Sequence, residues 1–517
     1  MGDNTMAERF NISNINSYRE NNRLEVKTAR EQLPSSFWET YSAFANTEGG
    51  CILLGVKERP DKTWYATGID DVDKMKKELW DLLHNPNKTS ACLLTEKNVT
   101  AYELDGHQIL AVEIPRAKRE QKPVYINHDL FSGTYRRDWE GDYCCSREAV
   151  LAMLRDQTDA TPDMKVLENK EIKDFNQDSI RSYRIRYNTS HDGHPWTELP
   201  DDEFLLMIGA ASDETSDHKI HPTAAGLLMF GFYHRIMTEF PDFLLDYYEI
   251  SDPAIRWTDR FASHSGDWSG NIYDFFTKVY LKLTVDLKRP FQLEDGLYRR
   301  DDTPVHKAVR EALANCLVNA DYLLPASVVV KKYPDRIVFS NPGTIRPGRK
   351  QMLRGGLSMP RNRVILNMLN YIGVGERAGS GVPDIYSVWK QENYLDPIVE
   401  ELSGREGTIR TVVTLPLVQK DSSGFQALFE KGPEKGPEKG PEKGPEKRPE
   451  TKTDEMTARC EAVLNAIKRD PKMPRPRLAA ELNLTEKQVR AAIEKLRENG
   501  TIYYEGSGRN GHWVIKS

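Results

Sequence analysis

The sequence KGPE occurs four times in tandem from residue 431 and is followed by KRPE, so that proline recurs at every fourth position. Proline has no backbone N–H and a fixed φ, which excludes regular helix and central strand from this stretch. The alternating Lys and Glu keep it in water, and its roughly twenty residues would reach about 60 Å when extended. We therefore predict a linker over 421–455 that separates a long N-terminal part from a C-terminal domain at 456–517.

The N-terminal part is too long for one hydrophobic core, since the whole chain has 517 residues, and we expect several domains. Hydrophobic residues make up 38% and charged residues 29% of the sequence, which is typical of globular domains with polar connections. No run of eighteen apolar residues could span a bilayer, and the start MGDNTMAERF lacks the apolar core of a signal peptide. We expect a cytoplasmic protein with no membrane partner.

Basic charge is concentrated in the C-terminal domain. Residues 456–517 hold twelve Lys and Arg against seven Asp and Glu, although the whole chain has a net charge of −6. The pattern predicts three helices and a hairpin, and Val489, Ile493 and Leu496 give the third helix one apolar face. This order resembles a winged helix-turn-helix domain, whose third helix enters the DNA major groove. The nucleic-acid-binding candidates on the outer face of that helix and on the wing are Lys487, Gln488, Arg490, Arg497 and Arg509. A winged helix used only for protein contacts or dimerisation is the alternative.

Near the N-terminus, the sequence ENNRLEVK is followed by SAFANTEGGCILLGVKE. Glu25 and Lys27 are two residues apart and would share one face of a strand. The aromatic residues of the next segment follow helical spacing up to the glycine pair 49–50, and CILLGV is a continuous apolar run, as in a strand covered on both faces. These patterns predict an α/β or α+β domain over 12–157.

This domain resembles the AlbA_2 family, also called the Schlafen-type DNA-binding domain, in its acidic-lysine motif, its AFANTEGG turn, its GV strand end and its PVY and YRR segments. The resemblance has two implications. Bacterial members are described as nucleic-acid-binding parts of regulators, whereas animal Schlafen relatives cut structured RNA with three carboxylates and a divalent metal. Glu20 and Glu25 match two of these acids, and Glu58 stands where the nucleases have Asp; Mg²⁺ or Mn²⁺ would be their ion. If the domain binds nucleic acid without cutting it, we expect Lys27, Arg136 and Arg137 to bind the phosphates.

A third group of residues lies at 306–392. The helix HKAVREALANCLVNADY places Glu311 and Asn315 four residues apart on one face, with Asn319 one turn further. Two strands, a helix, a glycine-rich loop and another helix follow. A carboxylate and an amide so placed can hold Mg²⁺ and orient a water. The predicted domain covers 301–420, and a connecting segment covers 158–300.

The order of these elements resembles the GHKL (Bergerat) ATP-binding fold, specifically its RecG C-terminal-like branch. The resemblance implies that Glu311 activates a water and that Asn315 binds Mg²⁺. Asn319 is a further nucleotide-binding candidate because of its position one turn along the same helix. It also implies a loop over the phosphates formed by Gly375, Gly379, Ser380 and Gly381. An acidic residue normally holds adenine in this family, but the comparable turn here contains Asn341, Pro342 and Gly343.

Two classes of function follow from these resemblances. The first is an ATP-binding, DNA-binding regulator of the transcriptional type, in which the nucleotide state controls nucleic-acid binding. The second is an enzyme, either a Schlafen-like metal-dependent ribonuclease acting in phage defence or an ATPase that remodels nucleic acid. We favour the regulator, with ATP and Mg²⁺ as cofactors, duplex DNA as partner, structured RNA as the alternative partner, and a homodimer or higher homo-oligomer as the assembly.

Overall fold

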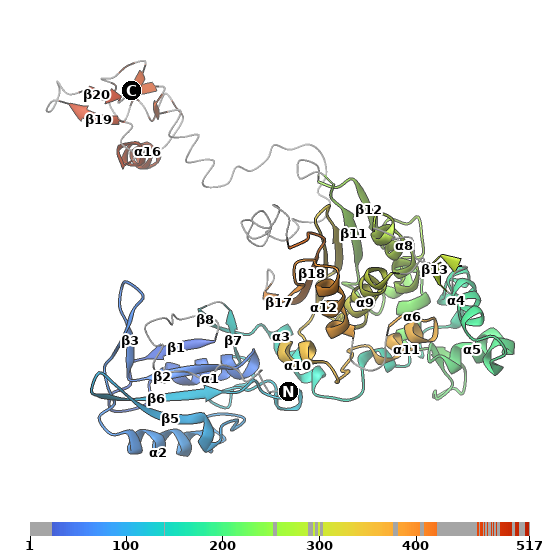
Figure 1. Cartoon of the computed structure of the whole chain (residues 1–517), viewed down its shortest axis with the longest axis horizontal. Helices are drawn as coiled ribbons and strands as arrows, with labels where there is room; N and C mark the ends of the chain where they lie inside the picture. Colours follow the sequence, from blue (N-terminus) through green and yellow to red (C-terminus); the bar gives the residue numbers. More distant parts are fainter. Residues whose placement is uncertain are drawn as a thin grey trace. The chain divides into compact units, whose positions relative to one another are not determined.

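The structure is a computed structural model, and it divides into two compact units, Met1–Glu434 and Lys435–Ser517 (Figure 1). In the first unit it describes residues 23–138, 140–251, 256–287, 293–294, 298–299, 303–375, 381–403 and 408–420. In the second unit it describes 486–498, 502–505, 512–515 and single residues between 463 and 482. Among the described residues, no helix is both long and apolar enough to cross a bilayer.

The N-terminal region, residues 23–157, is built on a four-stranded sheet with the order β1-β2-β6-β5. Strand β1 runs parallel to β2, and the other neighbours are antiparallel. The elements of the region are β1 (Leu24–Lys27), α1 (Ser36–Asn46), β2 (Gly50–Leu54), β3 (Val56–Glu58), β4 (Trp64–Ala66), α2 (Val72–Leu83), β5 (Val99–Leu104), β6 (His107–Ile114), β7 (Tyr135–Asp138), β8 (Gly141–Cys144) and α3 (Arg147–Asp156).

Strand β2 is buried on both faces, which confirms the interpretation of its continuous apolar run. Ile52 and Leu54 pack with residues of α1 and α2, whereas Cys51 and Leu53 pack with Trp64 of the β3–β4 hairpin. Successive strand side chains point to opposite faces, so an unbroken apolar sequence can bury both at once. The N-terminal region is therefore a sheet between two apolar layers.

The central region, residues 158–420, is built on a six-stranded sheet with the order β12-β11-β15-β16-β18-β17. Strands β11 and β15 are parallel, and all other neighbours are antiparallel. The strands are β11 (Leu245–Glu249), β12 (Asp259–Ala262), β15 (Val328–Lys332), β16 (Arg336–Pro342), β17 (Ile398–Ser403) and β18 (Ile409–Pro416). Two of them, β11 and β12, come from the predicted connecting segment, so this segment supplies part of the sheet.

Helices cover one face of this sheet and share one continuous core with it, which extends from Leu167 to Leu415. On β16, Ile337 and Phe339 belong to that core, and the residues between them are less buried. The helices of the region are α4 (Gln177–Ser190), α5 (Asp201–Met207), α6 (Ala224–Phe230), α7 (Tyr233–Ile236), α8 (Ile272–Thr284), α9 (Pro304–Val318), α10 (Arg349–Arg354), α11 (Arg363–Tyr371) and α12 (Gly381–Gln391). The order of helix, strand pair, helix and helix predicted for 306–392 is confirmed, and α10 is an addition to it.

The second unit contains helix α16 (Glu486–Glu498) and the antiparallel pair β19 (Ile502–Glu505) and β20 (His512–Ile515). Val489, Ile493 and Leu496 are buried in its small core together with Trp513, as the helical spacing predicted. The apolar face of the third predicted helix is therefore confirmed, and so is the hairpin that follows it.

Candidate functional site

The acidic-lysine motif forms a network of charges on one side of the N-terminal sheet. Glu25 and Lys27 share a face of β1, and their side chains are paired at 3.1 Å. The second carboxylate oxygen of Glu25 accepts a bond from Arg137 on β7 at 2.7 Å, and Arg137 also pairs with Asp142 on β8 at 3.0 Å. Burial opposes the charge on Arg137, but Asp142 and Glu25 outweigh it and raise the pKa of its guanidinium. The network ties the β7–β8 hairpin to β1.

The three basic residues predicted to bind phosphate are largely covered and paired. The side chain of Arg137 is only 1% exposed, and that of Lys27 is 10% exposed. Arg136 faces Glu401 of the central region at 3.6 Å. A phosphate at this place would have to compete with Glu25, Asp142 and Glu401, and the role of the three residues stays a prediction.

The three carboxylates of the nuclease hypothesis are not brought together within the described residues. Glu20 lies outside the part that the structure describes. Glu25 is held by Lys27 and Arg137, and Glu58 pairs with Lys62 at 3.1 Å across the β3–β4 hairpin. No group of three metal-binding side chains occurs among residues with a described position. Cleavage of RNA stays a prediction.

Sequence reasoning overlooked Asn46, the last residue of α1. Its amide nitrogen donates to the carbonyl oxygens of Val124 and Tyr135 at 2.8 and 3.0 Å, and its amide oxygen accepts from the Val124 N–H at 2.8 Å. These bonds fix the start of β7, and with it Arg136 and Arg137. An asparagine among apolar residues late in a buried helix was the available signal, because a buried amide needs such partners.

In the central region, four of the predicted nucleotide-binding residues lie together. The Asn315 side chain donates to Glu311 Oε1 at 3.0 Å, which confirms that the two share one face of α9. A Cβ added to Gly381, at the start of α12, would lie 2.0 Å from the same oxygen. One added to Gly375 would lie 3.9 Å from Glu311 Oε2. The carboxylate thus lies between the glycine loop and the amino end of α12, and Gly379 and Ser380 fall outside the described residues.

The other three predicted residues lie beyond the end of α9. Asn319 caps the helix by donating its amide to the Asn315 carbonyl oxygen at 3.0 Å, and its own carbonyl accepts from Arg361 at 2.6 Å. Gly343 has a φ of +102°, and a Cβ there would lie 2.5 Å from the Arg361 guanidinium. Asn341 is 3% exposed and its amide contacts the Pro342 carbonyl inside the sheet.

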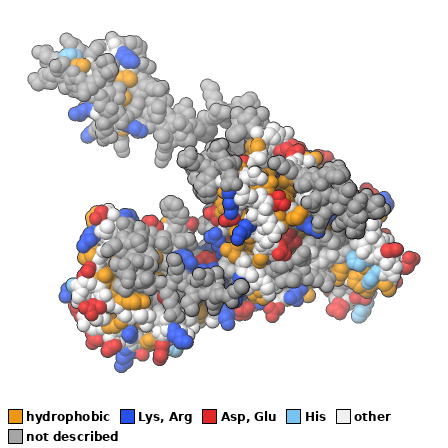
Figure 2. All heavy atoms as spheres, in the orientation of Figure 1, with side chains coloured by type: hydrophobic (Ala, Val, Ile, Leu, Met, Phe, Trp, Pro, Cys, Tyr) orange, Lys and Arg blue, Asp and Glu red, His pale blue; other side chains and the backbone are white. Residues whose placement is uncertain are grey.

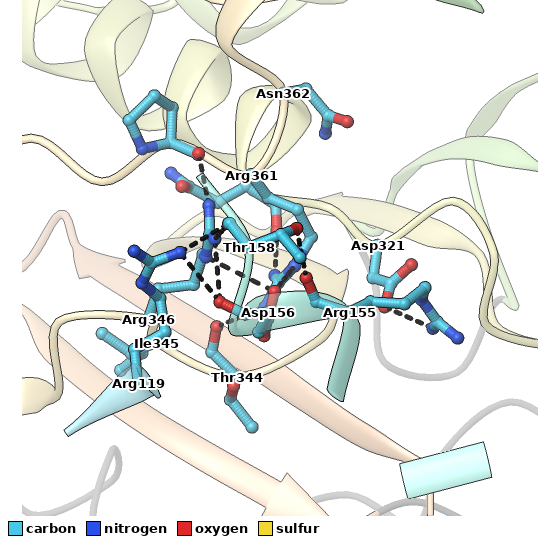
Figure 3. Close-up of polar contacts among 12 residues, drawn as sticks. Arg119, Arg155, Asp156, Thr158, Asp321, Thr344, Ile345, Arg346, Arg361 and Asn362 are labelled. Atoms are coloured by element: carbon cyan, nitrogen blue, oxygen red, sulfur yellow. Dashed lines mark hydrogen bonds and ion pairs between the residues drawn. The ribbon is translucent and has the colours of Figure 1, made fainter. Parts of the chain in front are cut away.

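Arg361, which the sequence did not single out, joins this end of α9 to the N-terminal region (Figure 3). Its guanidinium bonds both oxygens of Asp156, the last residue of α3, at 3.2 and 2.7 Å. Arg346 adds a contact to Asp156 at 3.4 Å, and Arg155 pairs with Asp321 at 3.0 Å. Burial alone would raise the pKa of Asp156, but Arg361 foremost and Arg346 after it lower that pKa. We call Asp156, Arg361 and Arg346 the junction cluster.

In the second unit, Arg490 and Arg497 are exposed on α16. Lys487 and Gln488 lie on the same helix, but their side chains are outside the description, and Arg509 is outside it entirely. The exposed positions alternate with the buried Val489, Ile493 and Leu496, so this helix has one basic and one apolar face.

Four family models match separate stretches of the chain. Residues 20–143 match the model described as "Schlafen, AlbA_2", and residues 326–407 match "Putative ATP-dependent DNA helicase recG C-terminal". Residues 461–503 match "Winged helix-turn-helix DNA-binding", and residues 151–246 match a domain of unknown function. The chain is therefore a multidomain α/β protein with an AlbA_2-like N-terminal domain, a RecG C-terminal-like domain and a C-terminal winged helix. These three predicted resemblances are confirmed, and they point to nucleotide and nucleic-acid binding.

Two solved structures match this chain, one over nearly its whole length and one over about a quarter of it. The crystal structure of the DIP2311 protein from Corynebacterium diphtheriae is 17% identical, with 96% of this chain and 92% of that chain covered and a TM-score of 0.39. The solution structure of the N-terminal domain of a "Putative ATP-dependent DNA Helicase RecG-related Protein" from Nitrosomonas europaea is 27% identical; 26% of this chain and 89% of that chain are covered, with a TM-score of 0.20. No curated protein matches the chain.

Proposed function

We propose that this chain is an ATP-binding, DNA-binding regulator of the transcriptional type, in which the nucleotide state controls nucleic-acid binding. The observation that carries the proposal is the double role of Arg361. It bonds the carbonyl of Asn319 at the end of α9, and it bonds Asp156 at the end of α3, the last helix of the N-terminal region. A shift of α9 on nucleotide binding would therefore act directly on the N-terminal domain.

The residues around Glu311 fit a GHKL-type site for ATP and Mg²⁺. The amide nitrogen of Asn315 donates to Glu311, so the amide oxygen of Asn315 remains for a metal ion. Oxygen ligands of this kind are the ones that Mg²⁺ prefers. Bound Mg²⁺ would supply positive charge against the phosphates. Glu311 is placed to accept a proton from a water, and Gly381 lets the start of α12 approach this carboxylate more closely than any side chain would permit. The backbone N–H groups at the start of a helix favour anions.

Replacing Asn315 by alanine is expected to weaken ATP binding in the presence of Mg²⁺ by about ten- to hundredfold. The reason is the loss of one bond toward a charged group, worth about 1.5–3 kcal/mol. Isothermal titration calorimetry measures the change. Lys307→Ala, on an exposed position of the same helix, is the matched control and should leave the affinity unaltered. Equal affinities for Asn315→Ala and the unmodified chain, with unchanged unfolding midpoints, would reject the site.

Binding of DNA would use the exposed Arg490 and Arg497 of the winged helix, with Lys487, Gln488 and Arg509 as further candidates. Its tether, the KGPE segment, would allow it to reach DNA held by the rest of the chain. We also propose cytoplasmic localisation and a homodimer or higher homo-oligomer as the working form. Structured RNA is the alternative nucleic acid, and Schlafen-like RNA cleavage by Glu20, Glu25 and Glu58 is the alternative activity.

A further inference from the structure

The segment that begins with β16 has an unusual charge. The forty residues from 336 to 375 contain no Asp or Glu but seven Arg and Lys, and six of these seven lie between 344 and 363. Elsewhere the chain is acidic on balance, since its net charge is −6 and its C-terminal domain is basic. An acid-free basic run in a folded domain creates a local positive potential that attracts polyanions.

Some basic residues of this segment are paired with a carboxylate inside the protein, and others are exposed. Arg361 and Arg346 belong to the junction cluster. Arg349, Lys350 and Arg354, all on the short helix α10, are exposed. Among the described residues, none of these three has a carboxylate within 4 Å. Their charges are therefore directed to the solvent.

Two carboxylates beside the segment are paired with arginines of the N-terminal region. Glu48 pairs with Arg116 at 2.8 Å. Glu401 accepts from the Ile345 N–H at 2.7 Å and faces Arg136 at 3.6 Å. These acids are therefore paired with arginines inside the first unit, and of the two only Glu48 also acts on Lys350, whose pKa it raises.

The residues immediately before α10 lie against the AlbA_2-like domain. Arg116 donates to the Ile345 carbonyl at 2.9 Å, and a Cβ on Gly348 would lie 2.9 Å from the Arg116 guanidinium. The start of β1 lies close to these contacts, because the Arg23 carbonyl accepts from the Cys51 N–H at 2.8 Å and Arg116 donates to the Thr47 carbonyl at 2.8 Å. Partial burial first, and then the charge of Arg23, lower the pKa of Lys350, whereas Glu48 raises it. Arg23 is itself exposed. In Figure 2, Lys and Arg side chains gather where the N-terminal region meets the central region.

We propose that Arg23, Arg349, Lys350 and Arg354 form one surface that binds the phosphate backbone of duplex DNA across the boundary of the two domains. The inference rests on the proposed function and adds to it a second DNA contact, separate from the winged helix. Three of the four residues are arginines, whose planar guanidinium matches a phosphate with two parallel bonds. Duplex DNA is the expected occupant because the same chain carries a DNA-binding winged helix. Contacts to the backbone alone carry no sequence preference, so this surface would add affinity and orientation, and the winged helix would read the site.

The test uses the full-length chain with the winged helix disabled by Arg490→Glu and Arg497→Glu. In this background, the triple substitution Arg349→Glu, Lys350→Glu, Arg354→Glu is compared with a control of equal charge change, Lys74→Glu, Lys77→Glu, Lys97→Glu, on exposed positions in and after α2. Fluorescence anisotropy measures the affinity for a labelled random-sequence duplex between about 50 and 200 mM salt, the range in which phosphate contacts change affinity most.

The α10 variant should bind at least about tenfold more weakly, and its plot of log affinity against log salt should lose about 0.9 in slope for each phosphate contact removed. The control should keep the slope of its parent. Replacing the three α10 residues by Gln should reduce the affinity for the duplex by an intermediate amount. An unchanged unfolding midpoint for this variant would exclude misfolding as the cause.

Equal slopes for the α10 variant and the control would overturn the inference while leaving the proposed function intact, provided that the chain with an active winged helix binds the duplex. Absence of duplex binding by the unmodified chain would overturn both. Equal losses of affinity for the duplex and for poly-glutamate of matched charge would assign the surface to an acidic protein, and would overturn the assignment to DNA.

Discussion

Replacing Arg361 by alanine is expected to destabilise the first unit by about 3–5 kcal/mol, because it leaves a buried carboxylate without its main partner. The side chain of Arg361 is 3% exposed and that of Asp156 is 18% exposed. The substitution removes both bonds to Asp156, the bond to the Asn319 carbonyl at 2.6 Å and a weaker one to Thr344 at 3.3 Å. Arg346 remains, but its contact at 3.4 Å is the longer one. Urea unfolding followed by tryptophan fluorescence measures the loss.

The matched control is Arg363→Ala, two residues further along the same segment. Arg363 is exposed, and surface substitutions of this kind usually change stability by less than about 0.5 kcal/mol. The double variant Arg361→Met, Asp156→Leu should recover much of the lost stability, since apolar residues often replace a buried ion pair at little cost. If Arg361→Ala lowers the free energy of unfolding no more than Arg363→Ala does, then the junction cluster does not stabilise the first unit as we infer.

Replacing Arg137 by methionine is expected to cost a similar amount, about 3–5 kcal/mol, because Glu25 and Asp142 would lose the cation between them. Arg137 is 1% exposed and also lies over the ring of Phe44 at 5.2 Å. Glu25 would keep Lys27, and Asp142 would keep the bond from the Thr40 hydroxyl. Neither of these contacts joins β1 to the β7–β8 hairpin. Hydrogen exchange of the hairpin amides should therefore accelerate more than that of β2.

The control for this variant is Lys57→Met on β3, where the side chain is exposed. It removes one positive charge from the same domain without touching the network. If Arg137→Met and Lys57→Met unfold at the same urea concentration, then Arg137 does not hold this part of the domain together, and Arg137 would be better interpreted as a residue kept for a ligand.

Local patterns in the sequence predicted a large part of the fold. The apolar run of β2 required burial on both faces, and the four-residue spacing of Glu311 and Asn315 required a shared face of α9. The buried side of α16 followed from the helical spacing of Val489, Ile493 and Leu496. In each case the pattern lies within one element, where periodicity shows which side chains are buried or share a face, although it does not show which distant residues cover them.

The remaining features depend on contacts between distant residues. Asp156 and Arg361 are 205 positions apart, and no local pattern marks either residue as a partner of the other. The pairing of β11 with β15 likewise joins the predicted connecting segment to the RecG C-terminal-like domain. Asn319 was grouped with Glu311 from its helical spacing and Asn341 from its place in a turn, and neither pattern showed that Asn319 contacts Arg361 or that Asn341 is buried in the sheet; their role at a nucleotide stays a prediction. Order along the chain does not determine which side chains meet.

The central claim is that the nucleotide state controls DNA binding through the junction cluster. Its most direct test is the affinity of the full-length chain for duplex DNA, measured with and without ATP and Mg²⁺, in the unmodified protein and in the Asp156→Asn variant. Our account predicts that the nucleotide changes the affinity of the unmodified chain by at least about fivefold, a coupling of about 1 kcal/mol, and that Asp156→Asn reduces this change while ATP still binds. An unmodified chain that binds ATP but has the same DNA affinity with and without it would contradict the account.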